Sequence, residues 1–351
     1  MDSPIREQRR RRPRPRTGEG GRRLHSAGSA IVVSLAGLAL AVLLNAPGLH
    51  KSATIQPEGW KRDVALDVTG PVESLSGALL LDRPRHALKS ALGRSHDDDV
   101  DTAVATTTTP VGAPVSAPAT PPERTRFTPK RKLGVYIAGD SLVVVPGESL
   151  LRATAGNRAI APEPIDGRIA TGLERPDVFN WFTHIEDVMR KDKPRAVVLM
   201  FGGNDDHNFM TGVPEGRQVG TFGSPSWRAE YRRRVATVME TVTRNGAYLV
   251  WIGLPISRDS EQTKRFDVMN TIVQGEAAKR PGRVSYLDTY FFFAGGDGGY
   301  AQYVEDSAGK LVKMRADDGV HFERPAGDLI AAKVLERLED RYDLTSWRRG
   351  G

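Results

Sequence analysis

The octapeptide VYIAGDSL occupies residues 135–142 and runs from apolar residues into Gly-Asp-Ser-Leu. The run LGVYIA at 133–138 is short and apolar, as expected of a buried β-strand. Ser141 stands just after this run. Taken alone, it is either a turn or helix-cap serine or a nucleophile held at the end of a strand. Residues elsewhere in the chain decide between these two interpretations.

Strands and helices alternate along the chain after residue 132. Short apolar runs at 195–203, 247–255 and 283–288 predict three more strands. Helical patterns occupy 148–155, 177–191, 227–245, 261–278 and 327–342, and Asp177 is suited to cap the second of them. This alternation predicts an α/β domain at 132–345, with a mostly parallel sheet covered on both faces.

Polar residues follow the predicted strands at the points where each strand ends. GDSL (139–142) follows the first strand, GGND (202–205) follows the second, and DDGVHF (317–322) precedes the last helix. In parallel sheets, ligands bind where loops leave the carboxyl ends of the strands. We therefore expect a hydroxyl, an amide and an Asp/His pair to meet at one edge of the sheet.

These residue types can form a nucleophilic site. A serine needs a base, and the base needs an acceptor on its other ring nitrogen. Asp318 and His321 are three residues apart, so in a turn Asp318 can accept from Nδ1 of His321 and leave Nε2 for Ser141. The backbone N–H of Ser141 and the amide of Asn204 are candidate oxyanion donors, and Gly172 in IATGLERP is a third.

Each of these residues also has an ordinary structural interpretation. Asn204 suits a left-handed turn after Gly203, and Asp318 suits turn chemistry. Their joint occurrence in this order favours the catalytic interpretation. The neighbouring Asp140, Asp205 and His207 are expected to contact substrate, since adjacent residues rarely converge on a metal. No metal and no cofactor are expected.

The four blocks resemble a known superfamily. GDSL, a separate glycine, GGND and DGVH resemble, in order and rough spacing, the blocks of SGNH (GDSL-type) esterases and acyl hydrolases. The resemblance covers about 132–342, and RIATGLERPDVFNW and KMRADDGVHF are similar to the bacterial DUF459 family. It implies a three-layer α/β/α fold and a metal-free acyl-enzyme mechanism. It also implies Ser141, Asp318 and His321 as the triad, with Ser141, Gly172 and Asn204 as the oxyanion donors. Gly167 is the alternative to Gly172.

The N-terminal region differs from the rest in composition. Residues 1–26 carry a net charge of +6, which leaves only +1 for the remainder of the chain. The next residues, 27–46, are overwhelmingly apolar or small, and no Asp, Glu, Lys or Arg lies between Arg23 and Lys51. About 20 such residues span a bilayer, and the preceding arginines favour a cytoplasmic N-terminus.

We therefore predict a basic cytoplasmic tail at 1–26 and a transmembrane helix at 27–46, followed by an extracytoplasmic domain in the cell membrane. A cleaved signal peptide is the rival interpretation, although cleavage after Ala46 would leave Pro47 first. The basic residues belong to the tail, so no nucleic acid partner is expected.

Two further segments connect the predicted membrane helix to the domain. Residues 47–100 are expected to form a juxtamembrane stem with short helices, and residues 101–131, rich in Thr, Pro and Ala, a flexible linker. The chain has no cysteine, which excludes disulfides, thiolate metal sites and a cysteine nucleophile.

An insertion between Asp288 and Asp318 precedes the Asp/His pair. Its segments YAQYV and KLVKMR predict a hairpin that turns around 306–309. We expect this insertion to form one wall of the site. Its aromatic residues could stack on sugar rings, but we expect most of them to form the hairpin's own core.

The sequence thus predicts a membrane-anchored extracytoplasmic serine esterase, with an O-acylated cell-envelope glycan or a small ester as the substrate. An O-acyltransferase with the same triad, or a catalytically silent glycan-binding module, are the alternatives.

Overall fold

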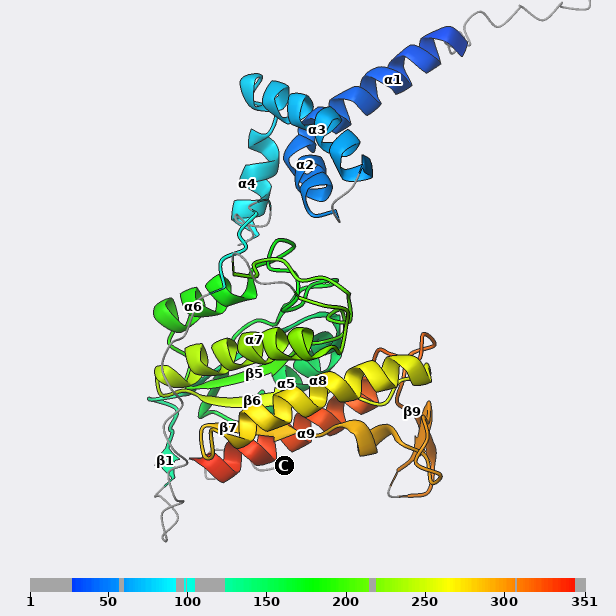
Figure 1. Cartoon of the computed structure of the whole chain (residues 1–351). Coiled ribbons are helices and arrows are strands. Elements are labelled where there is room, and N and C mark those ends of the chain that lie inside the picture. The colour runs from blue at the N-terminus through cyan, green and yellow to red at the C-terminus, as the bar shows by residue number, and fades with distance from the viewer. Residues whose placement is uncertain are drawn as a thin grey trace, which may run out of the picture. The chain divides into compact units, whose positions relative to one another are not determined.

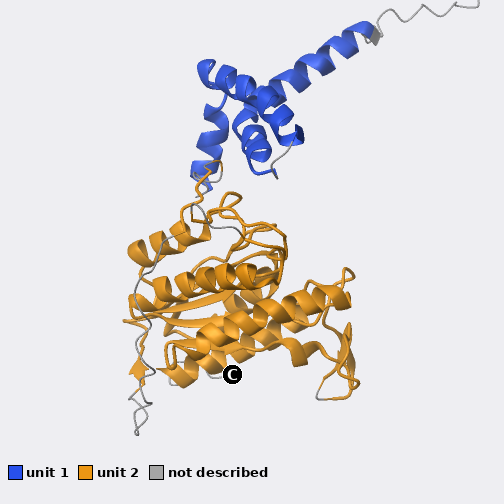
Figure 2. Cartoon of the chain, viewed as in Figure 1, with its two compact units in different colours: residues 1–95 blue, residues 96–351 orange. Residues whose placement is uncertain are grey.

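The computed structural model describes residues 27–56, 60–92, 98, 100–104, 124–214, 219–306 and 308–344. The chain divides into two compact units, residues 1–95 and 96–351 (Figure 2). The predicted cytoplasmic tail at 1–26 lies outside the described residues.

The second unit is built on a parallel sheet (Figure 1). Its strands follow the order β3 (Ile160–Pro162), β2 (Leu133–Gly139), β5 (Ala196–Met200), β6 (Tyr248–Ile252) and β7 (Val284–Leu287). The short β4 (Asp166–Gly167) pairs with the end of β2, and every pairing in this sheet is parallel. The predicted α/β fold with a mostly parallel sheet is confirmed.

Helices cover both faces of the sheet, which gives three layers. α6 (Trp181–Lys191), α7 (Pro225–Arg244) and α8 (Ser260–Ala278) pack in succession, and α5 (Val144–Thr154) packs against α9 (Arg324–Arg341). The central strands β2, β5 and β6 are almost entirely buried. Two-sided burial explains why these strands are apolar throughout rather than alternating.

The start of α6 differs from the sequence-based expectation. Asn180, not Asp177, is the N-cap, and its side chain accepts from the backbone N–H groups of Phe182 and Thr183. Asp177 instead forms an ion pair with Arg175 at 2.6 Å and accepts from Thr211. An asparagine and an aspartate are both good caps, so the sequence alone did not distinguish them.

The insertion contains the predicted hairpin. β8 (Tyr303–Glu305) and β9 (Leu311–Lys313) pair antiparallel, after a 3₁₀ turn η2 at Tyr290–Phe293. Phe293 is buried in the main core, and Tyr300 packs against that core. Phe291 and Tyr303 are exposed. The aromatic residues of the insertion therefore divide between an inner and an outer face.

Both ends of the predicted linker contact the domain. The side-chain amide of Asn180 donates to the carbonyls of Asp101 and Ala103. The short β1 (Thr125–Arg126) pairs with β10 (Tyr342–Asp343), just after α9. Residues 105–123 lie outside the described part of the chain.

The described residues of the first unit form the helices α1 (Ala27–Leu44), α2 (Ala46–Thr54), α3 (Trp60–Ala78) and α4 (Arg83–Ala91). Among its described residues, no single helix passes a test of length and hydropathy for crossing a membrane. Two bent pairs pass it together, α1 with α2 at 66° and α3 with α4 at 85°.

Candidate active site

Ser141 begins a 3₁₀ turn, η1 (Ser141–Val143), immediately after β2. Gly139, the last residue of β2, has φ of 156°, and a Cβ there would lie 2.0 Å from the carbonyl oxygen of Met200. Only glycine fits this approach of two neighbouring strands. The sequence places Ser141 at the carboxyl edge of the sheet, as predicted.

Asp140 fixes this strand end from within. Its carboxylate is fully buried and accepts from the backbone N–H of Leu142 at 2.9 Å, of Gly202 at 3.0 Å and of Gly203 at 2.8 Å. Desolvation raises the pKa of Asp140 to about 7, although these N–H donors oppose the shift. The carboxylate joins the ends of β2 and β5, and its burial excludes the predicted contact with substrate.

His321 and Asp318 complete a hydrogen-bonded relay with Ser141. The Oγ of Ser141 lies 2.8 Å from Nε2 of His321, and Nδ1 of His321 lies 2.7 Å from Oδ2 of Asp318. The side chains of Asp318 and His321 are half exposed. The structure therefore brings together the three predicted triad residues with the geometry that a nucleophile and its base require.

A tight turn holds Asp318 in place. The N–H of Gly319 donates to the carbonyl of Ala316 at 3.0 Å, and Gly319 has φ of 79°. The other carboxylate oxygen of Asp318 accepts from the backbone N–H groups of Val320 and His321. Partial burial would raise the pKa of Asp318, but these donors and the imidazole outweigh it and lower the pKa to about 2. Asp318 therefore stays ionised at neutral pH.

Asn204 contacts the loop that carries Gly172. The amide nitrogen of Asn204 donates to the carbonyl of Thr171 at 3.0 Å. That carbonyl belongs to the same peptide unit as the N–H of Gly172, so this bond sets the direction of that N–H. Among the described residues, neither the N–H of Gly172 nor that of Ser141 has a hydrogen-bond acceptor. Both remain open to bind an oxyanion.

Asp205 requires glycine at position 172. Its fully buried carboxylate accepts from the backbone N–H of Leu173 at 3.0 Å and of Glu174 at 2.9 Å, and from Tyr231 Oη at 3.0 Å. A Cβ at Gly172 would lie 2.1 Å from Oδ1 of Asp205. Asp205 thus holds the loop that carries Gly172, and its burial excludes the substrate contact predicted for it.

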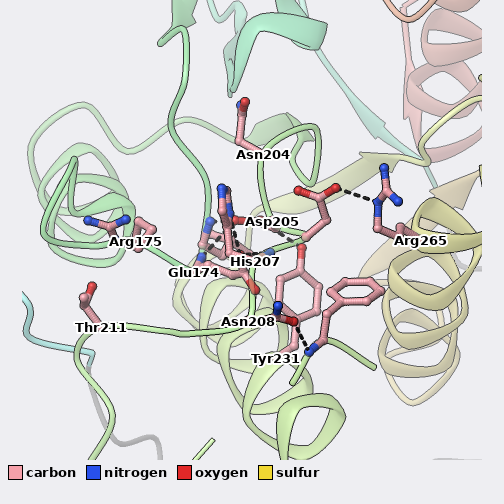
Figure 3. A network of polar contacts seen from close by, with 12 residues as sticks. Glu174, Arg175, Asn204, Asp205, His207, Asn208, Thr211, Tyr231 and Arg265 are labelled. Carbon is pink, nitrogen blue, oxygen red and sulfur yellow. Dashed lines mark hydrogen bonds and ion pairs between the residues drawn. The ribbon is translucent and has the colours of Figure 1, made fainter. Parts of the chain in front are cut away.

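His207 lies two residues after Asp205, on the loop that follows β5 (Figure 3). Its Nδ1 is 3.1 Å from the buried carboxylate of Glu174, which also accepts from the backbone N–H of His207 and from Nε1 of Trp227. Burial raises the pKa of Glu174, and this hydrogen bond raises the pKa of His207. The His207 side chain is half exposed, so a contact with substrate stays a prediction.

Sequence reasoning missed two arginines that hold the loops of the site. Arg234 on α7 is fully buried and donates to the carbonyls of Leu173, Glu174 and Thr211. Arg315 is also fully buried and donates to carbonyls beside His321. Arg234 stands on the face of α7 whose helical pattern predicts burial, which was the available signal. Among the described residues, no group of three or more metal-ligating side chains is present.

Fold and site define an α/β protein with a serine, a histidine and an aspartate aligned at the carboxyl edge of a parallel sheet. The chain belongs to the family described as "Protein of unknown function (DUF459)", whose model matches residues 134–337. The predicted resemblance to this family is confirmed. No match was found among curated proteins.

Several solved structures are similar to this chain at low identity. An acetylxylan esterase from Geobacillus stearothermophilus is 15% identical, with a TM-score of 0.39, and the match covers 62% of this chain and 97% of the esterase. The catalytic domain of a peptidoglycan O-acetyltransferase from Streptococcus pneumoniae is 13% identical (TM-score 0.35; 59% and 93% covered). A GDSL-like lipase from Bacteroides thetaiotaomicron is 14% identical (TM-score 0.38; 60% and 89% covered). The catalytic assignment therefore rests on this chain's own residues.

Proposed function

We propose that this protein is a serine esterase that acts through an acyl-enzyme on Ser141. The observation that carries the proposal is the relay of two short hydrogen bonds, 2.8 Å from Ser141 to His321 and 2.7 Å from His321 to Asp318. A turn serine or a surface histidine needs neither bond. Together they match the arrangement that activates a serine hydroxyl.

The first half-reaction follows from these positions. Oγ of Ser141 attacks the ester carbonyl, and its proton moves to Nε2 of His321, while Asp318 stabilises the imidazolium through Nδ1. The N–H groups of Ser141 and Gly172 stabilise the oxyanion. The amide of Asn204 orients the peptide that carries the Gly172 N–H through its bond to the carbonyl of Thr171, and a direct bond from Asn204 to the oxyanion would require it to leave that carbonyl. When the carbonyl reforms, the ester C–O bond breaks and the leaving alcohol takes the proton from His321.

The second half-reaction releases the acyl group. An incoming hydroxyl gives its proton to His321 as its oxygen attacks the acyl carbonyl, and Ser141 recovers the proton when it leaves. If water attacks, the protein is a hydrolase; if a glycan hydroxyl attacks, it is an O-acyltransferase. The complete relay and the open donors support an enzyme over a silent glycan-binding module.

A membrane location is part of this proposal. Side chains along α1 are exposed, among them Ile31, Leu35 and Leu38, and α3 exposes a stripe formed by Trp60, Val64, Val68 and Leu75. Inside the same unit, Ser76 is fully buried and donates to the carbonyl of Leu43. Exposed apolar side chains, together with a buried serine whose hydroxyl is hydrogen-bonded within the unit, suit contact with lipid. This location supports an O-acylated cell-envelope glycan as the substrate.

The location can be tested with the full chain in a bacterial host. We expect the protein to resist carbonate extraction and its C-terminal unit to be digested by protease added outside intact spheroplasts. Leu38→Asp places a charge in α1, which costs about 2.5–3.5 kcal/mol at the centre of a membrane helix, and should shift protein to the soluble fraction. Full extraction of the parent chain would disprove the anchor.

The catalytic proposal is tested with Ser141→Ala in the full chain, purified in detergent. The hydroxyl of Ser141 is the nucleophile, so hydrolysis of acetyl esters should fall to background while the melting temperature changes little. Ser149→Ala, a buried serine on α5 away from the relay, is the matched control and should keep its activity. Equal hydrolysis by Ser141→Ala and the parent would refute the mechanism.

A further inference from the structure

We propose that Arg315, carried by the insertion between β7 and α9, is a positioning residue that fixes the segment bearing the catalytic base. This inference rests on the proposed esterase function and assigns a role to the insertion. The guanidinium donates to backbone carbonyls of the turn between Asp318 and His321 and of the loop after β6. Aromatic rings of the insertion surround it.

The guanidinium binds carbonyl oxygens from two separate segments. Nη2 donates to the carbonyls of Val320 at 2.5 Å and Gly319 at 3.3 Å, while Nη1 donates to that of Ile256 at 2.5 Å. Nε lies 3.4 Å from the carbonyl of His321 itself. Arg315 therefore ties the turn between Asp318 and His321 to the loop that follows β6.

The backbone around Arg315 forms a second tie. Arg315 and Phe322 form an antiparallel bridge, the N–H of Ala316 donates to the carbonyl of His321 at 2.9 Å, and the N–H of Glu323 donates to that of Met314 at 2.8 Å. The Asp-x-x-His segment is thus the turn of a small hairpin whose first arm carries Arg315. A shift of this arm would displace His321 with it.

Aromatic rings enclose the charge. The guanidinium carbon lies 5.1 Å from the ring centroid of Phe322, 5.4 Å from Phe293 and 5.5 Å from Tyr300. Phe293 and Tyr300 belong to the insertion, and Phe322 follows the base directly. Cation–π attraction is strongest where water is excluded, and the Arg315 side chain is fully buried. The inner face of the insertion therefore serves to hold this cation.

The buried charge has no ion-pair partner among the described residues. Its hydrogen bonds all go to carbonyl oxygens. Desolvation lowers the pKa of Arg315 to about 10, so the side chain is still charged at neutral pH, and the negative charge of Asp318 opposes that shift. A buried, unpaired cation is costly. Its presence beside the base is explained if it orients the backbone that carries the base.

Arg280 provides a matched control. It is almost fully buried near the end of α8, and its guanidinium pairs with the carboxylate of Glu276 at 3.0 Å and with the carbonyl of the same residue at 2.8 Å. That end of α8 leads into the amino end of β7, at the opposite edge of the sheet from Ser141. Arg280→Met therefore removes a buried guanidinium without altering the segment that carries His321.

The test uses Arg315→Met, Arg315→Lys and Arg280→Met in the full chain, with an acetyl ester as substrate. A displacement of about 1 Å in a catalytic group costs roughly 10²-fold in rate. We expect Arg315→Met to lower kcat about 10²-fold with KM changed less than about 3-fold. The rate of fluorophosphonate labelling should fall by a similar factor. Arg315→Lys keeps the charge but cannot reach both segments, so we expect an intermediate loss.

Structural destabilisation alone predicts a different result. Arg280→Met should lower the melting temperature as much as Arg315→Met does but retain the parent kcat. Backbone amide exchange at Ala316, Gly319 and His321 should become faster in Arg315→Met and remain unchanged in Arg280→Met. Either a parental kcat in folded Arg315→Met, or equal losses in both arginine variants, would overturn the proposal.

Failure of the esterase proposal can be told apart from failure of this inference. If the parent chain neither hydrolyses esters nor reacts with fluorophosphonate, the proposed function is wrong, and the amide exchange at 316–321 still reports whether Arg315 holds the segment. If the parent is active and exchange at 316–321 is the same in parent and Arg315→Met, the positioning role is wrong. If Arg315→Met does not fold, the kcat and exchange of Arg315→Lys decide in the same way.

Discussion

The two sides of the site are held in place by different kinds of side-chain contact. On the nucleophile side, the buried carboxylates of Asp140 and Asp205 accept backbone N–H groups at the ends of the strands. On the base side, the buried guanidinium of Arg315 donates to backbone carbonyls of a turn. The sheet already fixes Ser141, whereas no strand of the sheet carries His321. The position of the base therefore depends on its own hairpin and on Arg315, whereas Ser141 directly follows a strand of the sheet.

Removal of the base should produce the largest effect in this comparison. We expect His321→Asn to lower kcat/KM for an acetyl ester by roughly 10⁴-fold, since triad members act as a unit. The half-exposed side chain contributes little packing, so the melting temperature should stay near that of the parent. A loss of less than about 10-fold would show that another group accepts the proton of Ser141.

The substitution Gly172→Ala tests the oxyanion donors on the nucleophile side of the site. The added Cβ would lie 2.1 Å from Oδ1 of Asp205, so Gly172→Ala forces the loop away from the carboxylate and misplaces one oxyanion donor. Loss of such a donor costs about 10²–10³-fold in kcat. Gly275→Ala in α8, where a Cβ meets nothing within 4 Å, is the control and should be neutral or slightly stabilising. Normal kcat in Gly172→Ala would remove Gly172 from the oxyanion site.

The charge of Asp318 gives the base side a specific pH dependence. Its folded pKa of about 2 lies below the ordinary aspartate value of 3.8. A depressed pKa stabilises the folded state above the unfolded pKa, and this contribution is lost as the pH falls through the folded pKa. The difference in melting temperature between parent and Asp318→Asn should therefore be constant above about pH 5 and shrink toward about pH 2. A difference that disappears between about pH 7 and 5 would contradict the assignment.

The outer face of the insertion should give the smallest effect. Tyr303 and Leu311 are exposed on the β8–β9 hairpin, whereas Phe293 and Tyr300 face Arg315. Leu311→Ser should change the free energy of unfolding by about 0.5 kcal/mol or less and leave kcat for a small acetyl ester unaltered. A large loss of kcat would show that the outer face, rather than the face around Arg315, supports the site.

The sequence was informative where local pattern determines structure. Apolar runs predicted the strands before Ser141 and Asn204, and so placed both residues at strand ends. The three-residue spacing predicted that Asp318 and His321 lie side by side. Strand ends and three-residue spacings are local properties of the sequence. The two-residue β4 was too short to produce a pattern. The burial of Asp140 and Asp205 was missed because a carboxylate beside a catalytic residue gives no sign of which side of the loop it faces.

Arg315 shows a second limit of the sequence. Its partners lie at Ile256, Phe293 and Tyr300 as well as in its own hairpin, and such contacts between distant segments have no periodic signature. An arginine three residues before Asp318 was the only local sign. Contacts of this kind depend on how the insertion folds back on the domain, which only the three-dimensional arrangement reveals.

The central claim is that Ser141 is activated by His321. The most direct measurement is intact-mass and peptide analysis of the full chain after reaction with a fluorophosphonate, for the parent and His321→Asn. We predict one adduct, on the peptide that contains Ser141, with labelling at least about 10²-fold slower in the variant. A folded parent chain that takes no label, or takes it on another residue, would contradict the account.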